Sequence, residues 1–167
     1  STPWPTWTFT VDDRTVSREI LCVRGQSTVV VRWRLLTPAR DSIELRVRPK
    51  LTSREYHALH HENGALSPEA TVTAQRVTWQ PYHDLPAVQC SHTGRYHHLP
   101  EWYRHVQFPM ERQRGLDFQE DWWSPGELLF HLESGREQAL ALTSEVVDDI
   151  EIGDLIRKER VRRVKRH

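Results

Sequence analysis

The sequence predicts an all-β protein, an antiparallel β-sandwich with short helical loop segments and one helix at its C-terminal end. Apolar and polar residues alternate with a period of two in several runs before residue 144, as in strands with one buried face. Turn-forming sequences such as Arg24-Gly25-Gln26-Ser27 and Ser134-Gly135 separate these runs. Strands of about five to nine residues without long helices between them favour a sandwich over a doubly wound α/β fold.

The clearest of these strands is 28–36, in which Val29, Val31 and Trp33 alternate with Val30 and Arg32. Further strands are predicted at 7–11, 16–23, 43–48, 72–79, 87–92, 128–132 and 139–142. Two stretches, 51–67 and 99–126, break the period, and we expect them to be loops. Loops on a rigid sheet scaffold often carry the functional residues of a protein.

The C-terminal end combines a helical pattern with a strong charge. Residues 156–167 contain seven Lys or Arg and one Glu, and the rest of the chain contains 16 basic and 22 acidic residues. The formal net charge of zero therefore separates into an acidic body and a basic end. Apolar residues continue at helical spacing after Ser144, which is a suitable N-cap. We expect a β-sandwich domain at 1–144 and an amphipathic, basic linker helix at 145–167.

Composition and cysteine content exclude several classes of protein. Hydrophobic residues make up 37% of the chain, and no apolar run approaches the ~20 residues that a membrane-spanning helix needs. The N-terminus has neither the basic start nor the apolar core of a secretory signal peptide. The two cysteines, Cys22 and Cys90, cannot form a disulfide framework, so we expect a cytoplasmic protein without a membrane partner.

The first irregular stretch carries a group of histidines. His57, His60 and His61 stand at i, i+3 and i+4, so on a helical turn they could share one face and bind a metal. A metal site needs a further ligand and oriented partners, and nothing nearby has a zinc-type Cys/His spacing. We therefore expect these rings to serve in polar packing or hydrogen bonding, and we expect no metal or other cofactor.

The second irregular stretch alternates charged groups with aromatic rings, among them Trp102, Trp122 and Trp123. A sugar ring has an apolar face and a rim of hydroxyl groups, so aromatic platforms beside Asp, Glu and Arg suit it. Residue types alone favour a plainer alternative, an aromatic segment packed on the sandwich with structural ion pairs, and leave sugar binding open. The other tryptophans are expected in the core or in strand packing, namely Trp4, Trp7, Trp33 and Trp79.

Several short motifs follow one another along the chain. They are Trp4-Pro5-Thr6-Trp7, Val29-Val30-Val31-Arg32-Trp33-Arg34-Leu35-Leu36, Arg48-Pro49, Arg54-Glu55-Tyr56-His57-Ala58-Leu59, Glu62-Asn63, Gln80-Pro81-Tyr82, Leu85-Pro86, Trp102-Tyr103, Glu111-Arg112, Arg114-Gly115-Leu116-Asp117, Glu120-Asp121 and Ser124-Pro125-Gly126. In this order they resemble the N-terminal domain of bacterial and archaeal glycogen debranching enzymes of the amylo-α-1,6-glucosidase type. The resemblance runs from about Pro3 to Ser144.

The resemblance implies a β-supersandwich placed before an (α/α)6 catalytic barrel, in an enzyme that hydrolyses α-1,6 branch glucose from glycogen or related α-glucans. The catalytic carboxylates of such enzymes belong to the barrel, so no catalytic residue is expected here. The implied partners are an α-glucan oligosaccharide and the C-terminal barrel. Lys50 and Ser53 depart from the family pattern. A Gly-rich segment upstream of the Trp-containing strand is also lacking, so we expect an interior fragment or a shortened relative of the family domain.

We therefore expect a non-catalytic domain whose two irregular stretches help to shape an α-glucan site that the barrel completes. The residues expected to contact the substrate are Arg54, Tyr56, His57, Glu62, Asn63, Tyr103, Glu111, Arg114, Asp117, Glu120, Asp121 and Trp123. Each of them could equally hold a loop or pack against the barrel.

Two alternative functions stay open. One is a purely structural sandwich that stabilises the barrel or a dimer interface. The other is nucleic-acid binding, in which basic side chains at the C-terminal end neutralise phosphates and release counterions. Those side chains are Arg157, Lys158, Arg160, Arg162, Arg163, Lys165 and Arg166. The acidic body argues against nucleic acid, and a solvated linker helix explains the basic run more simply.

Overall fold

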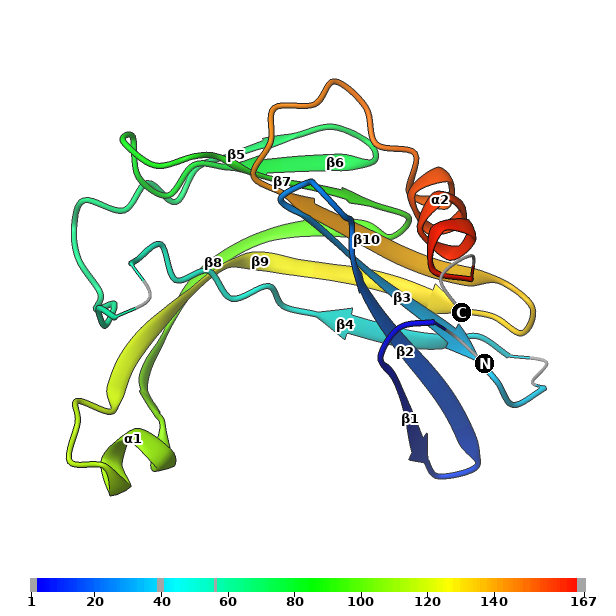
Figure 1. Ribbon diagram of the computed structural model, residues 1–167, viewed down its shortest axis with the longest axis horizontal. Coiled ribbons are helices and arrows are strands. Elements are labelled where there is room, and N and C mark those ends of the chain that lie inside the picture. The colour runs from blue at the N-terminus through cyan, green and yellow to red at the C-terminus, as the bar shows by residue number, and fades with distance from the viewer. Residues whose placement is uncertain (1–2, 39–40, 56, 165–167) are drawn as a thin grey trace.

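The computed structural model describes residues 3–38, 41–55 and 57–164, and it confirms an antiparallel, all-β fold (Figure 1). The strands of the larger sheet are β1 (Thr6–Val11), β2 (Arg14–Cys22), β3 (Thr28–Leu35), β5 (Ala70–Val72), β6 (Arg76–Trp79), β7 (Val88–His92) and β10 (Glu137–Thr143). The smaller sheet consists of β4 (Ile43–Val47), β8 (Arg95–Gln107) and β9 (Gln119–Leu132). The helices are α1 (Pro109–Gln113) and α2 (Ile152–Val164). The strand orders are β1-β2-β3-β10-β7-β6-β5 and β4-β9-β8.

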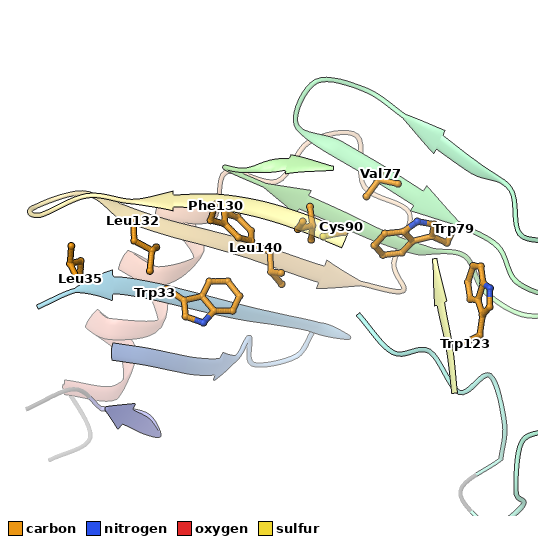
Figure 2. Packing of buried hydrophobic residues seen from close by; sticks show 10 residues of the cluster. Trp33, Leu35, Val77, Trp79, Cys90, Trp123, Phe130, Leu132 and Leu140 are labelled. Atoms are coloured by element: carbon orange, nitrogen blue, oxygen red, sulfur yellow. The ribbon is translucent and has the colours of Figure 1, made fainter. Parts of the chain in front are cut away.

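The two sheets pack face to face through one apolar cluster (Figure 2). Trp33 of β3 lies against Phe130 of β9, with ring centroids 5.3 Å apart. Farther along the sandwich, Trp79 Nε1 of β6 donates a hydrogen bond of 3.0 Å to the hydroxyl of Tyr96 on β8. The period-two alternation of 28–36 is therefore confirmed, because it directs Trp33 and Leu35 into this interface.

A second apolar cluster lies on the opposite face of the larger sheet, beneath α2. Leu21, Val30 and Ala141 are cross-strand neighbours on β2, β3 and β10, and they pack with Trp4 and Ile156. The larger sheet is thus covered on one face by the smaller sheet and on part of the other face by α2 (Figure 1).

Beside this second cluster the sheet buries an ionic network. The Glu19 carboxylate is 1% exposed; it pairs with Arg32 and Arg34 and accepts a hydrogen bond of 2.7 Å from Trp4 Nε1. Burial alone would raise the pKa of Glu19, but the hydrogen bonds from Arg32 and Trp4 and the two positive charges outweigh it. The pKa of Glu19 therefore lies below its usual value, and the carboxylate stays ionised.

The C-terminal helix begins later than the sequence pattern predicts, so the expected helical start after Ser144 is wrong. The helix α2 begins at Ile152, and tertiary hydrogen bonds hold the segment before it in a non-helical path. The amide of Ser27 donates to Glu145 Oε1 at 2.7 Å, and Arg76 donates to the carbonyls of Val147 and Asp148. Those carbonyls accept from a side chain instead of from helical amides.

Charged side chains hold α2 on the larger sheet, in addition to the apolar contacts of Ile156. Glu159 is 5% exposed and accepts hydrogen bonds from the amide of Arg24 and from Arg162 and Arg163. The bond from Arg162 is the main cause that lowers the pKa of Glu159 to about 2. Arg163 also donates to the carbonyls of Pro3 and Cys22. The helix is thus packed on the sandwich, and its role as a linker stays a prediction.

The two irregular stretches have different outcomes. The described residues of 51–67, which are all but residue 56, form no helix or strand of the sheets, which confirms the expected loop. The expected loop at 99–126 is wrong, because β8, α1 and β9 form a long hairpin that projects beyond the sandwich (Figure 1). Aromatic and charged residues occupy both faces of this two-stranded arm and hide its period. Likewise, the strand expected at 72–79 is the hairpin of β5 and β6.

No helix in the described ranges is long and apolar enough to span a membrane.

Candidate functional site

The loop 51–67 lies along the projecting end of the β8–β9 hairpin. The backbones of Leu51 and Trp123 exchange two hydrogen bonds of 2.8 and 3.3 Å, and the amide of Asp121 donates to the carbonyl of His60 at 2.7 Å. The two stretches that the sequence singles out, which are far apart along the chain, are therefore joined in space.

Glu120 on β9 is the main side chain at this junction. It is 1% exposed; its carboxylate pairs with Arg54 at 2.7 Å, accepts from Trp122 Nε1 at 2.7 Å and accepts from the amide of His60 at 3.3 Å. Burial alone would raise the pKa of Glu120, but the bonds from Arg54, Trp122 and His60 outweigh it, so the pKa lies below its usual value. Glu120 therefore holds the loop as a permanent anion.

Asp121, the next residue, fixes the same junction from the other face of the strand. Its carboxylate accepts hydrogen bonds of 2.9 Å from the amides of Glu62 and His105, and these bonds hold the pKa of Asp121 below its usual value. His105 has φ of 60° and lies where the β8–β9 register shifts, so Asp121 stabilises a bulge in the arm. Glu62 in turn pairs with Arg104.

Replacing Glu120 with glutamine is expected to destabilise the protein by about 1.5–3 kcal/mol at pH 7, because hydrogen bonds to a buried charge are lost. A carboxylate whose folded pKa is lowered stabilises the fold above its unfolded pKa and loses this contribution as the pH falls through the folded pKa. The difference between wild type and Glu120→Gln in urea unfolding should therefore shrink at pH values well below 4.5, the usual value for Glu. Glu44→Gln, an exposed paired glutamate, serves as the control; an equal difference for Glu120→Gln at pH 7 and pH 3 would contradict the assignment.

Between the loop and the tip of the hairpin lies an open groove of about 1070 Å³. Arg54 and His57 line it from the loop, and Glu111 and Asp117 line it from the hairpin tip. Aromatic and aliphatic side chains complete the wall, namely Phe108, Leu116 and Phe118. A shallower hollow of about 310 Å³ adjoins it through shared Arg54 and Phe108 and adds Lys50, Glu120 and Trp122. The groove thus combines hydrogen-bonding groups of both charges with apolar rings.

The structure places four of the expected site residues in this groove and three more in the network that joins its walls. Arg54, His57, Glu111 and Asp117 line the groove. Glu120 and Asp121 hold its walls together, as does Glu62 through its amide. Arg114 is not among the lining residues but pairs with Glu111, which is, at 3.2 Å.

Two further expected site residues, Tyr103 and Asn63, are not among those that line the groove. Tyr103 lies on β8, where its hydroxyl accepts from Arg48 at 2.9 Å and the ammonium of Lys50 lies over its ring. Asn63 donates to the hydroxyl of Tyr82 at 2.7 Å. Tyr56 lies outside the described residues.

Trp123 has a different role from the one expected. Its side chain is 1% exposed and belongs to the apolar cluster between the sheets (Figure 2), so it cannot offer a face to a sugar. The structure therefore corrects this expectation. Trp7, conversely, is 41% exposed on β1 and packs across the strands against Arg18, so of the two expected roles it has strand packing and not a place in the core.

The histidine group does not form a shared cluster. His60 is buried and bonded through its ring nitrogens to the Tyr82 hydroxyl and the Asp121 carbonyl, whereas His57 and His61 lie at the groove surface. In the part of the chain that the structure describes, no group of three or more His, Cys, Asp or Glu side chains is arranged to hold a metal ion.

The basic side chains of α2 are largely engaged within the protein. Arg157 pairs with Asp154 at 2.6 Å, Arg162 and Arg163 pair with Glu159, and Arg160 lies over the Trp4 ring at 5.6 Å. Lys165 and Arg166 lie outside the described residues. These contacts explain most of the described basic run without nucleic acid.

Sequence reasoning missed the apolar wall of the groove. Phe108, Leu116 and Phe118 line it, and Arg112 stacks over Phe118 at 5.3 Å. The available signal was the spacing of these residues on both sides of a Pro–Gly-bounded segment, 109–115, which is typical of a hairpin tip.

Comparison with known proteins agrees with this architecture. Residues 1–139 match the family model described as glycogen debranching enzyme N terminal, which is most of the chain. A search of curated proteins finds no match.

Proposed function

The chain belongs to the glycogen debranching enzyme N-terminal family, and we propose that it is a non-catalytic domain that contributes to α-glucan binding beside a separate (α/α)6 α-1,6-glucosidase barrel. The observation that carries the proposal is the groove between the loop and the hairpin tip, which two remote segments of the sequence build together. Its volume of about 1070 Å³ is at the upper end of the range for small-molecule sites.

The chemistry of the groove suits an oligosaccharide. Phe108 and Phe118 supply apolar surface for the faces of pyranose rings. Glu111 and Asp117 can accept hydrogen bonds from sugar hydroxyls, and Arg54 can donate to them. Because Glu120 holds Arg54 at 2.7 Å, the guanidinium is oriented before a ligand arrives, which lowers the entropic cost of binding.

The carboxylates at the junction are unsuited to serve as the general acid of glycoside hydrolysis. A glycosidase acid needs a raised pKa so that it carries a proton at working pH. Glu120 and Asp121 have lowered pKa values and already accept several hydrogen bonds. This supports a binding role for the domain and catalysis by the separate barrel.

The proposal includes the setting of the domain. We infer that it supports the barrel in one enzyme of cytoplasmic glycogen metabolism, with α2 and the residues after it leading toward the barrel. Both cysteines are free thiols, which suits a reducing compartment. Co-expression of the barrel with and without this domain tests the supporting role: activity and solubility should fall without it, and equal values would contradict it.

Titration with maltoheptaose is expected to give millimolar binding to the isolated chain, because the groove is only one side of the complete site. Asp117→Asn and His57→Ala should each weaken binding at least about tenfold, which is about 1.4 kcal/mol, without lowering the Tm. Amide chemical shifts measure both the affinity and the fold. Asp84→Asn changes an exposed aspartate outside the groove and should bind as wild type.

Two results would argue against the proposal. Equal affinity in Asp117→Asn, His57→Ala and Asp84→Asn would place the sugar elsewhere. No response at tens of millimolar sugar would rule out autonomous binding and favour the purely structural alternative.

A further inference from the structure

The core face of the larger sheet continues beyond the smaller sheet onto β1 and β2. Two rows of cross-strand neighbours show this: Phe9, Val16 and Leu35 form one, and Trp7, Arg18 and Trp33 form the other. Leu35 and Trp33 are buried at 5% and 7% exposure, whereas Phe9 and Trp7 are 45% and 41% exposed. One continuous apolar face is thus covered by the smaller sheet at β3 and left uncovered at β1. We call the uncovered part, formed by Trp7, Phe9 and Arg18, the Trp7–Phe9 ledge.

Above this uncovered ledge the smaller sheet ends with an open edge. Within the described ranges β4 pairs with β9 alone, so the backbone groups along its other side have no strand beside them. Ile43 and Leu45 pack on the same cluster as Trp33 and Leu35. The open edge of β4 therefore lies next to the two cross-strand rows that end at Phe9 and Trp7 on β1.

The ledge also carries an unmatched cation. The Arg18 guanidinium stacks against the Trp7 and Phe9 rings at 4.8 and 5.1 Å. In the described part of the chain no ion pair to a carboxylate is found for Arg18, and its Nε is buried without a hydrogen-bond acceptor. A group that covers the ledge must therefore be mainly apolar and must bring an acidic side chain or a carbonyl oxygen to Arg18.

The dimensions of the ledge restrict what can cover it. Strands lie about 4.8 Å apart in a sheet, so β1 and β2 leave room above them for about two strands. Suppose that a second copy paired its β4 with this β4, so that the two smaller sheets formed one continuous sheet. The larger sheets of both copies would then lie on the same face of that continuous sheet. The β1 and β2 strands of both copies would then compete for the same layer. A single extended segment carries no second sheet, so it can pair with β4 without this overlap.

We propose that the β4 edge and the Trp7–Phe9 ledge form a strand-acceptor site. The site takes an extended polypeptide segment that does not belong to residues 1–167. The segment has apolar side chains at alternate positions and an acidic group that faces Arg18. The segment pairs with β4 by β-augmentation, and its inward side chains cover Trp7 and Phe9, extending the existing core interface. The site lies at the opposite end of the molecule from α1 (Figure 1), so it is independent of the proposed sugar groove.

The probe is a synthetic nonapeptide of alternating valine and threonine with glutamate in place of the central valine. Saturating peptide is expected to slow amide exchange at Ile43–Val47 at least tenfold. A version with proline at the two central threonines should give no protection, because proline cannot donate to a sheet. Trp7→Ala and Arg18→Gln should each weaken binding at least fivefold. Val72→Ala truncates an exposed apolar side chain (51%) on the opposite edge strand β5 and should leave binding unchanged.

Thermal melts identify any variant that fails to fold. If Trp7→Ala or Arg18→Gln does so, Phe9→Ser takes its place in the binding measurement. Unchanged exchange at Ile43–Val47 with wild-type protein would overturn the proposal, as would protection confined to β1 or β5. Sedimentation of the free chain as a dimer with protected β4 amides would assign the edge to a second copy and would also overturn it.

Discussion

Replacing Glu19 with alanine is expected to lower the free energy of unfolding by about 3–5 kcal/mol, because the change removes the buried carboxylate that Arg32 and Arg34 share and leaves the buried Arg32 with only the half-exposed Glu137 as a partner. Arg32 and Arg34 both pair with this carboxylate, which is 1% exposed. The Trp4 indole also loses its acceptor, so the N-terminal segment and α2, which pack around Trp4, should loosen with it. Urea unfolding at pH 7 measures the loss.

Glu137→Ala is the matched control for this prediction. Glu137 also pairs with Arg32, but its side chain is 47% exposed, so its removal should cost less than about 1 kcal/mol. Equal losses for the two variants would mean that the buried network contributes no more than a surface ion pair does.

Trp123→Ala is expected to cost about 3–5 kcal/mol of stability, the usual price of a cavity left by a large buried aromatic ring. Trp123 is 1% exposed and contributes to the cluster between the sheets, and its backbone also bonds to Leu51 at the start of the loop 51–67. Thermal or urea unfolding measures the effect. Trp7→Ala, which truncates a ring that is 41% exposed, should cost less than about 2 kcal/mol.

The Trp123 prediction also separates two interpretations of the aromatic stretch. A sugar platform would lose affinity on truncation while the protein stayed stable. A core residue loses stability first, and the folded fraction of Trp123→Ala should bind sugar as the wild type does. A variant with wild-type stability and no sugar binding would contradict the core assignment.

The sequence predicted the sandwich well where one strand face is buried and the alternation is clear. Val31 and Trp33 face the smaller sheet, as the alternation in 28–36 indicates. The prediction failed at 99–126, because the β8–β9 arm has aromatic residues on both faces: Trp102 packs against the core while Tyr103 binds Arg48. It also failed before Ile152, where bonds from Arg76 and Ser27 override the helical pattern.

The candidate site was predicted in outline. Charged residues of both irregular stretches do meet, as Arg54 and Glu120 show. Residue types alone do not distinguish a carboxylate that lines a groove, such as Asp117, from one that holds the walls together, such as Glu120. That distinction depends on burial and on backbone donors such as the amide of His60, which arise only when the chain is folded.

We propose above all that an α-glucan occupies the groove between the loop and the hairpin tip. Mapping amide chemical shifts during a maltoheptaose titration tests it most directly. We expect the largest shifts on residues that line the groove, on the loop around His57 and on the hairpin tip from Glu111 to Gln119. Shifts confined to α2 or to the Trp7–Phe9 ledge would contradict it, as would the absence of any shift.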